Sequence, residues 1–244
     1  MRLDKLLANS GYGSRKDVKS LLKQKRVTVN DSVVKDSSVH VDPEIDFIKV
    51  GDHAVHYQKY IYLMMNKPKG VISATEDMKD KTVIDLLTTD LQRFKAFPVG
   101  RLDKDTEGLL LITNDGELAH QLTSPKKDIE KVYYAQVQGN VTEGDTEAFT
   151  KGVVLDDGYK TKPAQLRILK RDAISEVEVS ITEGKYHQVK RMFEAVGKKV
   201  MYLRRISMGG LILDETLQLG TYRELTENEL YYLRPTNNEM EGFK

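Results

Sequence analysis

The stretch Gly100–Gly116, GRLDKDTEGLLLITNDG, decides the fold of this chain, because it places a short polar loop directly before an apolar strand. The apolar run at 109–112 is too short for a lone helix, and turn-forming residues at 114–116 end it. We therefore expect a buried strand at 109–112 and a helix at 116–122. A buried strand would hold the preceding loop in place.

Asp103 lies in this loop between Arg101 and Lys104, two cations that favour its charged form. A charged carboxylate in a fixed loop is suited to act as a nucleophile or a base. The alternative is an ordinary solvated charge, because such carboxylates also occur in structural ion-pair networks. The loop alone favours that alternative, so the rest of the chain has to decide.

The composition is typical of a soluble globular protein. Of the 244 residues, 39% are hydrophobic and 31% are charged, and this length suits the two unequal domains that we expect. The sequence has no cysteine, which excludes disulfides, thiolate zinc sites and a cysteine nucleophile. No apolar run approaches a membrane span and no secretory signal is present, so we expect a cytoplasmic protein.

Positive charge is concentrated in two segments, although the formal net charge is only +1. Residues 1–30 carry eight cations against two carboxylates, and residues 183–205 carry seven against two. These segments suggest two places where a polyanion is bound. The alternative is a pair of Lys-rich faces that are merely solvated.

Residues 1–58 have the pattern of a small basic domain with two helices and a hairpin. Leucines within 3–7 have helical spacing, and Ser14 with Asp17 forms a variant capping box at the start of a second helix. The face of that helix opposite its apolar residues is almost entirely basic. Two short strands are expected around a turn at 30–32.

The rest of the chain is expected to form a larger domain at 59–235, reached through a polar linker at 52–59 and followed by a polar tail at 236–244. Interspersed strands and helices with short connections predict an α+β fold with a mainly antiparallel mixed sheet. Besides the strand and helix predicted above, we expect strands at 61–65, 132–138, 165–169 and 176–181 and helices at 82–88, 144–150 and 187–196.

The first domain resembles an S4 RNA-binding domain, through the segment RLDKLLANSGYGSRKDVKSLLKQKRVTVND at 2–31. The resemblance covers nearly the whole domain and implies that it binds structured RNA. The cations that would contact phosphates are Arg2, Arg15, Lys16, Lys19 and Lys23. The alternative is a helix pair that only caps the larger domain.

Segments of the larger domain together resemble the RsuA branch of ribosomal RNA pseudouridine synthases. They are NKPKG at 66–70, GRLDKDTEGLLLITNDG at 100–116, EKVYYAQV at 130–137 and EGKYHQVKRMFEAVGKKV at 183–200. TKPA at 161–164 and KYHQVKRMF at 185–193 are similar to the branch members that modify 16S rRNA; large-subunit relatives usually carry asparagine and arginine at the positions of Tyr186 and His187. The resemblance implies an α+β catalytic domain that modifies one uridine in the decoding-region stem of 16S rRNA.

Isomerisation of uridine breaks the bond from ribose C1′ to uracil N1 and re-forms it at C5, so no redox step, metal or cofactor is required. The resemblance implies that Asp103 is the nucleophile or base, and that Tyr133 stacks on the flipped-out uridine. It also implies that Lys190 pairs with Asp103, where the wider superfamily usually has arginine. Attack on C1′, elimination through a glycal and addition to C6 all stay open, because they place the same carboxylate at the same nucleoside.

Further residues are expected to contact the substrate by resemblance: Arg101, Asn66, Lys67 and Leu203. For Arg101 the alternative is an ion pair with Asp105 or Glu107, and for Leu203 it is a core position. His187 is expected to be structural. The carboxylates at 103, 105, 107 and 115 are a weak candidate for Mg²⁺, because cations alternate with them.

Two other functions stay open. The S4-like half alone would suit a noncatalytic RNA-binding or ribosome-assembly protein, and paired carboxylates also act at the anomeric carbon in nucleoside or glycoside hydrolases. The expected partner is 16S rRNA, either naked or in a small-subunit assembly intermediate. We expect a monomer that needs neither a membrane nor an obligate protein partner.

Overall fold

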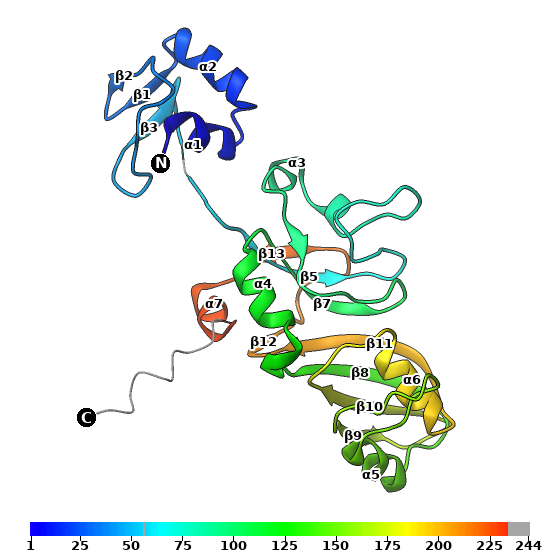
Figure 1. Ribbon diagram of the computed structural model, residues 1–244. Helices are drawn as coiled ribbons and strands as arrows, with labels where there is room; N and C mark the ends of the chain where they lie inside the picture. The colour runs from blue at the N-terminus through cyan, green and yellow to red at the C-terminus, as the bar shows by residue number, and fades with distance from the viewer. Residues whose placement is uncertain (56, 234–244) are drawn as a thin grey trace, which may run out of the picture. The chain divides into compact units, whose positions relative to one another are not determined.

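The chain folds into two compact units in a computed structural model that describes residues 1–55 and 57–233 (Figure 1). The first unit holds Met1–Ile61 with Thr88–Lys95, and the second holds Tyr62–Leu87 with the chain from Ala96 onward. The expected tail at 236–244 lies outside the described residues. Within the described residues, no helix has the length and apolar character that crossing a membrane requires.

Helices and a small antiparallel sheet share one hydrophobic core in the first unit. Leu6, Leu22, Val27 and Ile48, from four different elements, are buried together in it. The sheet order is β2-β1-β3-β4. The elements are α1 (Leu3–Asn9), α2 (Arg15–Lys23), β1 (Val27–Val29), β2 (Ser32–Val33), β3 (Ile48–Val50), β4 (His53–Ala54) and α3 (Thr89–Gln92).

The predicted start of α2 is confirmed. The hydroxyl of Ser14 accepts from the N–H of Asp17 at 3.3 Å, and the Asp17 carboxylate accepts from the N–H of Ser14 at 2.8 Å. The predicted hairpin is confirmed as well, with a two-residue turn at 30–31 whose φ values of 50° and 61° match the twist of the strands. Strands β3 and β4 were not predicted, and β4 occupies part of the expected linker at 52–59.

A mixed sheet of nine strands forms the centre of the second unit, in the order β13-β5-β7-β11-β8-β10-β9 with β12 beside β11 and β6 beside β7. Its strand pairs are antiparallel except β7 with β11, so the predicted α+β class and mainly antiparallel sheet are confirmed. The strands are β5 (Tyr62–Lys67), β6 (Phe97–Pro98), β7 (Glu107–Thr113), β8 (Lys131–Gln138), β9 (Gln165–Lys170), β10 (Ile174–Ile181), β11 (Lys199–Met208), β12 (Leu211–Ile212) and β13 (Tyr222–Glu224). The helices are η1 (Ile84–Leu86), α4 (Gly116–Thr123), η2 (Pro125–Lys127), α5 (Glu143–Lys151), α6 (Gln188–Ala195) and α7 (Glu227–Leu233).

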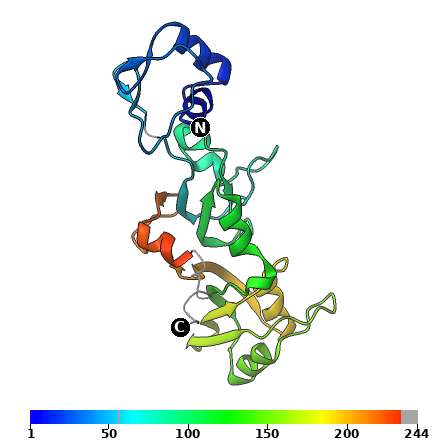
Figure 2. The same cartoon turned by 60° about the vertical axis from the view of Figure 1, so that its left-hand side comes forward.

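Strand β7 is the buried strand that the opening stretch predicts, and all of its residues are buried. Asp115 ends it and begins α4, because its carboxylate accepts from the N–H groups of Glu117 and Leu118. Helix α4 covers one face of this part of the sheet, where Leu118 packs with Leu109 and Leu111 (Figure 2).

In the other half of the sheet, buried and more exposed side chains alternate along the strands. Tyr133, Ala135 and Val137 of β8 are buried on one face together with Val177 and Val179 of β10. The expected helix at 82–88 is wrong, because only a 3-10 turn forms at 84–86 and the preceding backbone pairs with the strand-like segment near residue 72.

Candidate active site

The loop that carries Asp103 is tied to its neighbours through its own backbone. The hydroxyl of Ser73 accepts from the N–H of Leu102 at 3.0 Å and donates to the carbonyl of Leu102 at 2.9 Å. The N–H of Gly70 donates to the carbonyl of Lys104 at 2.8 Å. The loop is therefore fixed on both sides of Asp103.

Lys67, the last residue of β5, supports the same loop from within the core. Its Nζ donates to the carbonyl oxygens of Pro68, Asp103 and Thr106 at 3.1, 3.0 and 2.9 Å. Burial lowers the pKa of Lys67 to about 8, although the charge of Asp103 opposes this shift. An ammonium has three donors, and all are used on backbone oxygens, so this geometry does not support the expected contact of Lys67 with substrate. Lys67 is placed to position the loop.

Lys190 on α6 forms an ion pair with Asp103. Its Nζ lies 3.1 Å from Oδ2 of Asp103 and 2.6 Å from Oδ1 of Asp105. Burial works to lower the pKa of Lys190, but hydrogen bonds to Asp105 and Asp103 outweigh it and raise the pKa above its ordinary value. One ammonium therefore bridges two carboxylates and keeps its proton.

His187 faces the other oxygen of the Asp103 carboxylate. Its Nε2 lies 3.7 Å from Oδ1 of Asp103. With φ of 49°, His187 is in the left-handed region immediately before α6. Its ring stacks on Tyr186 with centroids 3.8 Å apart, and Tyr186 is 76% exposed. The structural role expected for His187 does not account for this placement beside the candidate nucleophile.

The cations next to Asp103 in the sequence do not pair with it. Lys104 Nζ lies 2.6 Å from the carboxylate of Asp80. Arg101 is exposed and forms no ion pair with any residue in the described ranges. Neither neighbour therefore forms an ion pair with Asp103 within the described ranges. Lys190, 87 positions away along the chain, provides the positive charge instead.

The other carboxylates of the opening stretch have separate partners. Asp105 binds Lys190 rather than Arg101, and Glu107 accepts a hydrogen bond from the hydroxyl of Tyr202 at 2.7 Å. Asp115 caps α4. The alternative ion pair for Arg101 is thus wrong, and within the described part of the chain these carboxylates do not gather into a metal-ligand group.

Tyr133 and Leu203 lie on one face of the sheet, on neighbouring strands. Arg205 on β11 lies opposite Tyr133 on β8, and Leu203 is two residues before Arg205, so the three side chains share a face. Tyr133 is 9% exposed and Leu203 is 5% exposed. Arg205 also pairs with the start of β7, directly after the Asp103 loop. Tyr133 is therefore about 10 Å, or two strand spacings, from that point.

Glu183 connects two segments that are distant in the sequence, TKPA at 161–164 and KYHQVKRMF at 185–193. Its buried carboxylate accepts from the N–H of Lys162 at 2.9 Å, from the side-chain amide of Gln188 at 2.8 Å and from the hydroxyl of Tyr159 at 2.7 Å. Both segments are thus anchored at the start of α6, the helix that carries the cation of the site. Glu183 was not predicted as a site residue, because only its place in the 183–200 segment indicated it.

Asn66 lies on the opposite face of β5 from Lys67. It is 2% exposed, its side-chain amide donates to the carbonyl of Leu217 at 2.6 Å, and its backbone N–H donates to Thr221. Its Oδ1 is buried without a partner among the described residues. These bonds join β5 to the loop at 217–221, and they do not support the expected contact of Asn66 with substrate.

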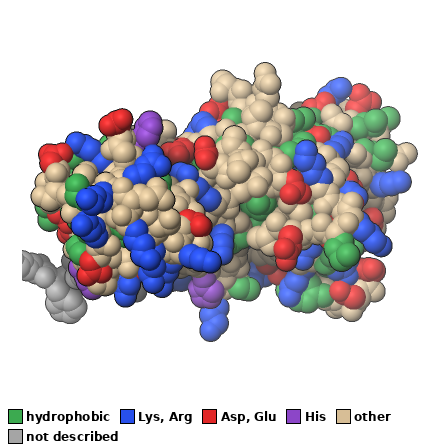
Figure 3. All heavy atoms as spheres, turned by 90° about the horizontal axis from the view of Figure 1, so that it is seen from above, with side chains coloured by type: hydrophobic (Ala, Val, Ile, Leu, Met, Phe, Trp, Pro, Cys, Tyr) green, Lys and Arg blue, Asp and Glu red, His purple; other side chains and the backbone are tan. Residues whose placement is uncertain are grey.

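The expected RNA-binding cations of α2 form an exposed basic face. Figure 3 shows Lys and Arg side chains gathered over the N-terminal unit. Arg2 differs, because its guanidinium bonds both carboxylate oxygens of the buried Asp4 at 3.1 and 2.9 Å, so its charge is already compensated. The other expected cations, Arg15, Lys16, Lys19 and Lys23, are exposed and form no ion pair within the described ranges.

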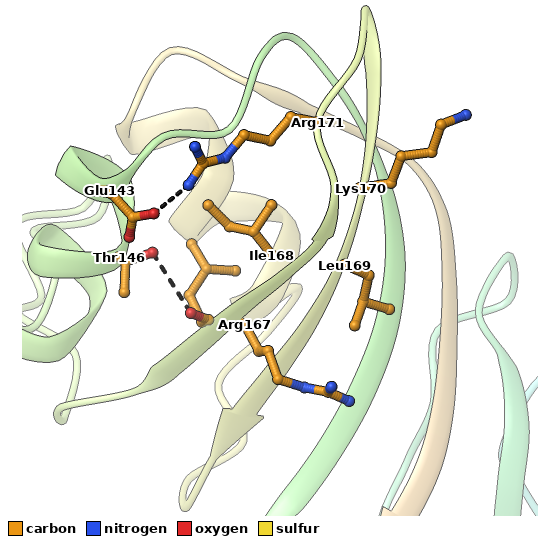
Figure 4. A pocket seen from close by; sticks show the side chains of 8 residues that line it. Glu143, Thr146, Arg167, Ile168, Leu169, Lys170 and Arg171 are labelled. Carbon is orange, nitrogen blue, oxygen red and sulfur yellow. Dashed lines mark hydrogen bonds and ion pairs between the residues drawn. The ribbon is translucent and has the colours of Figure 1, made fainter.

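A separate hollow of about 480 Å³ lies between α5 and β9 (Figure 4). Glu143 and Arg171 form an ion pair at its edge, and the hydroxyl of Thr146 donates to the carbonyl of Leu166. The hollow shares no residue with the Asp103 site. It is therefore not part of the candidate active site.

Comparison with known proteins covers both units. The family model described as RNA pseudouridylate synthase matches residues 61–195, and the S4 domain model matches residues 1–44. The first match contains Asp103, Tyr133 and Lys190.

Relatives match along nearly the whole chain. An uncharacterized RNA pseudouridine synthase of Bacillus subtilis is 54% identical over 96% of this chain and 98% of its own length. Ribosomal small subunit pseudouridine synthase A of Escherichia coli is 39% identical over 94% and 98%, and ribosomal large subunit pseudouridine synthase B of Bacillus subtilis is 40% identical over 96% and 95%. A crystal structure of a pseudouridylate synthase, 38% identical, matches with a TM-score of 0.68 and covers 96% of this chain and 100% of that one.

Proposed function

The chain belongs to the RNA pseudouridylate synthase family, and from this membership we propose that it converts one uridine of 16S ribosomal RNA to pseudouridine with Asp103 as the nucleophile or base. It is an RsuA-type ribosomal RNA pseudouridine synthase. Membership of this family argues against the two alternative functions, a noncatalytic RNA-binding protein and a hydrolase. The proposal beyond the family concerns the substrate and the residues.

The observation that carries the assignment of Asp103 is its fixed, ion-paired carboxylate. The loop backbone is held on both sides, and Lys190 bonds one carboxylate oxygen at 3.1 Å. A carboxylate oriented in this way is ready to attack the nucleoside or to start an elimination, without a metal. Tyr133 is proposed as the ring on which the flipped uracil stacks, with Leu203 beside it.

Replacing Asp103 by asparagine tests this assignment. We expect wild-type protein to form pseudouridine at one position when it is incubated with 16S transcript or with small-subunit particles, and Asp103→Asn to form none. Asp172→Asn, an exposed change in the loop after β9, serves as the matched control and should give full product. Full product from Asp103→Asn would refute the catalytic role of Asp103. Free uracil in the mixture would indicate hydrolysis instead of isomerisation.

The preference for 16S rRNA rests on local segments, because overall identity to the small-subunit and large-subunit relatives is nearly equal at 39% and 40%. TKPA and KYHQVKRMF, which are similar to 16S enzymes, meet at Glu183 and at the start of α6. Both segments therefore support the start of α6, the helix that carries Lys190. Pseudouridine mapping in 16S and 23S rRNA from strains with and without the gene tests the preference. Loss of a modification from 23S rRNA alone would contradict it.

The basic face of α2 is proposed to bind RNA phosphates. Changing Lys16, Lys19 and Lys23 together to glutamine should weaken RNA binding and lower the salt dependence of log K by about 2 to 3, because each contact releases counterions. A control with Lys151, Lys160 and Lys170 changed to glutamine should keep the salt dependence. An unchanged slope in the α2 variant would remove α2 from the RNA interface.

A further inference from the structure

Arg205 is a buried arginine that forms no ion pair with any carboxylate of the described residues. It is 3% exposed and lies on β11, between β7 and β8. Its Nε donates to the carbonyl of Leu109 at 2.8 Å, but its Nη2 is buried and meets no acceptor among the described residues. A buried guanidinium nitrogen without an acceptor is costly, so a ligand at Nη2 is the natural explanation.

A second cation lies beside it. Lys131 is partly buried at the start of β8 and forms no ion pair within the described ranges. Burial, and after it the positive charge of Arg205, lowers the pKa of Lys131. Asp128 opposes this effect, but Asp128 is in an ion pair with Lys162. Two like charges are thus held together without a counter-charge of their own.

Both cations flank Tyr133 on its own face of the sheet. Arg205 lies directly opposite Tyr133, and Lys131 is two residues before it on β8. Such neighbours are about 5 and 7 Å away. In a nucleotide, one sugar separates the phosphate from the base. When the base stacks on Tyr133, its phosphate can therefore reach the two cations.

We propose that Arg205 and Lys131 bind one phosphate of the RNA backbone next to the uridine that stacks on Tyr133. The inference rests on the proposed function for the identity of the stacked base. A phosphate provides acceptors for the free Nη2 and for the ammonium, and it neutralises the like charges. During the isomerisation the detached uracil must rotate while its ribose stays in place. A held phosphate provides that restraint.

A purely structural role accounts for only part of these observations. β7 and β11 pair at only two positions before they diverge, and the Nε of Arg205 bonds the carbonyl of Leu109 at this point. That bond explains one donor of Arg205. It explains neither the free Nη2 nor the second cation at Lys131.

Titration with mononucleotides tests the proposal on the full-length protein. The probes are uridine, uridine 3′-monophosphate and uridine 5′-monophosphate, with affinity measured by calorimetry or NMR. One of the two phosphates should raise affinity about tenfold over uridine in wild type, as for a charge-assisted hydrogen bond. In Lys131→Gln the gain should fall to about threefold or less. Lys151→Gln, an exposed lysine on α5, should keep the full gain.

Turnover gives a second readout that a structural role would not move. Lys131→Gln should raise KM for RNA far more than it lowers kcat, and Lys131→Arg should restore KM. Arg205→Lys keeps the charge at the buried position and should give an intermediate phosphate gain. Equal gains in wild type and Lys131→Gln, or no gain from either phosphate, would overturn the phosphate site. Absence of pseudouridine with normal mononucleotide binding would instead overturn the proposed function.

Discussion

The two oxygens of the Asp103 carboxylate have different surroundings. Oδ2 bonds Lys190 at 3.1 Å, whereas Oδ1 is 3.7 Å from the nearest ring nitrogen of His187, too far for a hydrogen bond. The contact at Oδ2 therefore orients the carboxylate, whereas Oδ1 is the oxygen that we propose to act on the substrate. This division suits all three chemical routes, since each begins with a free carboxylate oxygen.

Removing the positive charge at Lys190 should slow the chemical step. Lys190→Met is expected to lower kcat roughly 10²- to 10³-fold with little change in KM, because it removes the ammonium that pairs with Asp103 and orients its carboxylate. Lys190→Arg should retain more activity, since the charge remains while the bridge to Asp105 changes geometry. Initial rates of pseudouridine formation check this. A change in KM alone would show that Lys190 only binds RNA.

Lys67 should make the stability of the protein depend on alkaline pH. Its pKa in the folded protein is about 8, against 10.5 for an ordinary lysine, so between these values the unfolded chain binds more protons. Stability contributed by Lys67 therefore rises with pH across that window, by up to about 3 kcal/mol.

Urea unfolding from pH 7.5 to 10.5 measures this effect as the difference in free energy of unfolding between wild type and Lys67→Met. Titration of other groups is common to both proteins and cancels in the difference. A difference that stays constant or falls with pH would refute the shifted pKa.

The partner of Asp103 was predictable only through resemblance. Arg101 and Lys104 are next to it in the sequence, yet neither forms an ion pair with it within the described ranges, and Lys190 reaches it from a helix distant in the sequence. The burial of Lys67 was not predictable either. A lysine in a turn segment is ordinarily solvated, and only tertiary packing shows that its donors meet three carbonyl oxygens.

At the scale of elements, the junction of β7 and β11 connects the Asp103 loop to the Tyr133 face. Gly108 is at this junction with φ of 102°, and a Cβ there would lie 2.2 Å from the carbonyl oxygen of Arg205. The parallel strands approach so closely because this position has no side chain.

Gly108→Ala should destabilise the second unit by at least about 3 kcal/mol, because the contact is with backbone and φ is unfavourable for alanine. Gly116→Ala is the matched control: its Cβ meets nothing within 4 Å in the first turn of α4. It should be neutral or stabilise by up to about 1 kcal/mol. Denaturant unfolding measures the free energy of unfolding of both variants. Equal values would contradict the close approach of β7 to the backbone of Arg205.

Elements with a continuous pattern and clear end signals were predictable. β7 contains the apolar run at 109–112, and Asp115 caps the start of α4. β11 was missed because Arg204 and Arg205 interrupt its apolar pattern, although Arg205 is buried. In the sequence, a buried arginine cannot be distinguished from an arginine on the surface.

At the scale of the whole molecule, the proposed RNA-binding face of α2 and the proposed catalytic site belong to different units. The first has its own core and carries the basic face of α2, whereas the second contains the complete Asp103 site. The second basic segment, at 183–205, includes both Lys190 and Arg205. The two concentrations of charge in the sequence thus belong to different units, so each unit offers positive charge to a polyanion.

Separate cores predict separate unfolding transitions. Leu22 is fully buried in the first unit and Leu110 is fully buried in the second. Leu22→Ala should lower the stability of the first unit by about 2 to 5 kcal/mol and leave the second nearly unchanged, whereas Leu110→Ala should do the reverse. Calorimetry combined with hydrogen exchange assigns each transition to its unit. If both variants shifted both transitions equally, the units would fold as one cooperative body, and RNA binding could not be weakened in α2 without altering the Asp103 site.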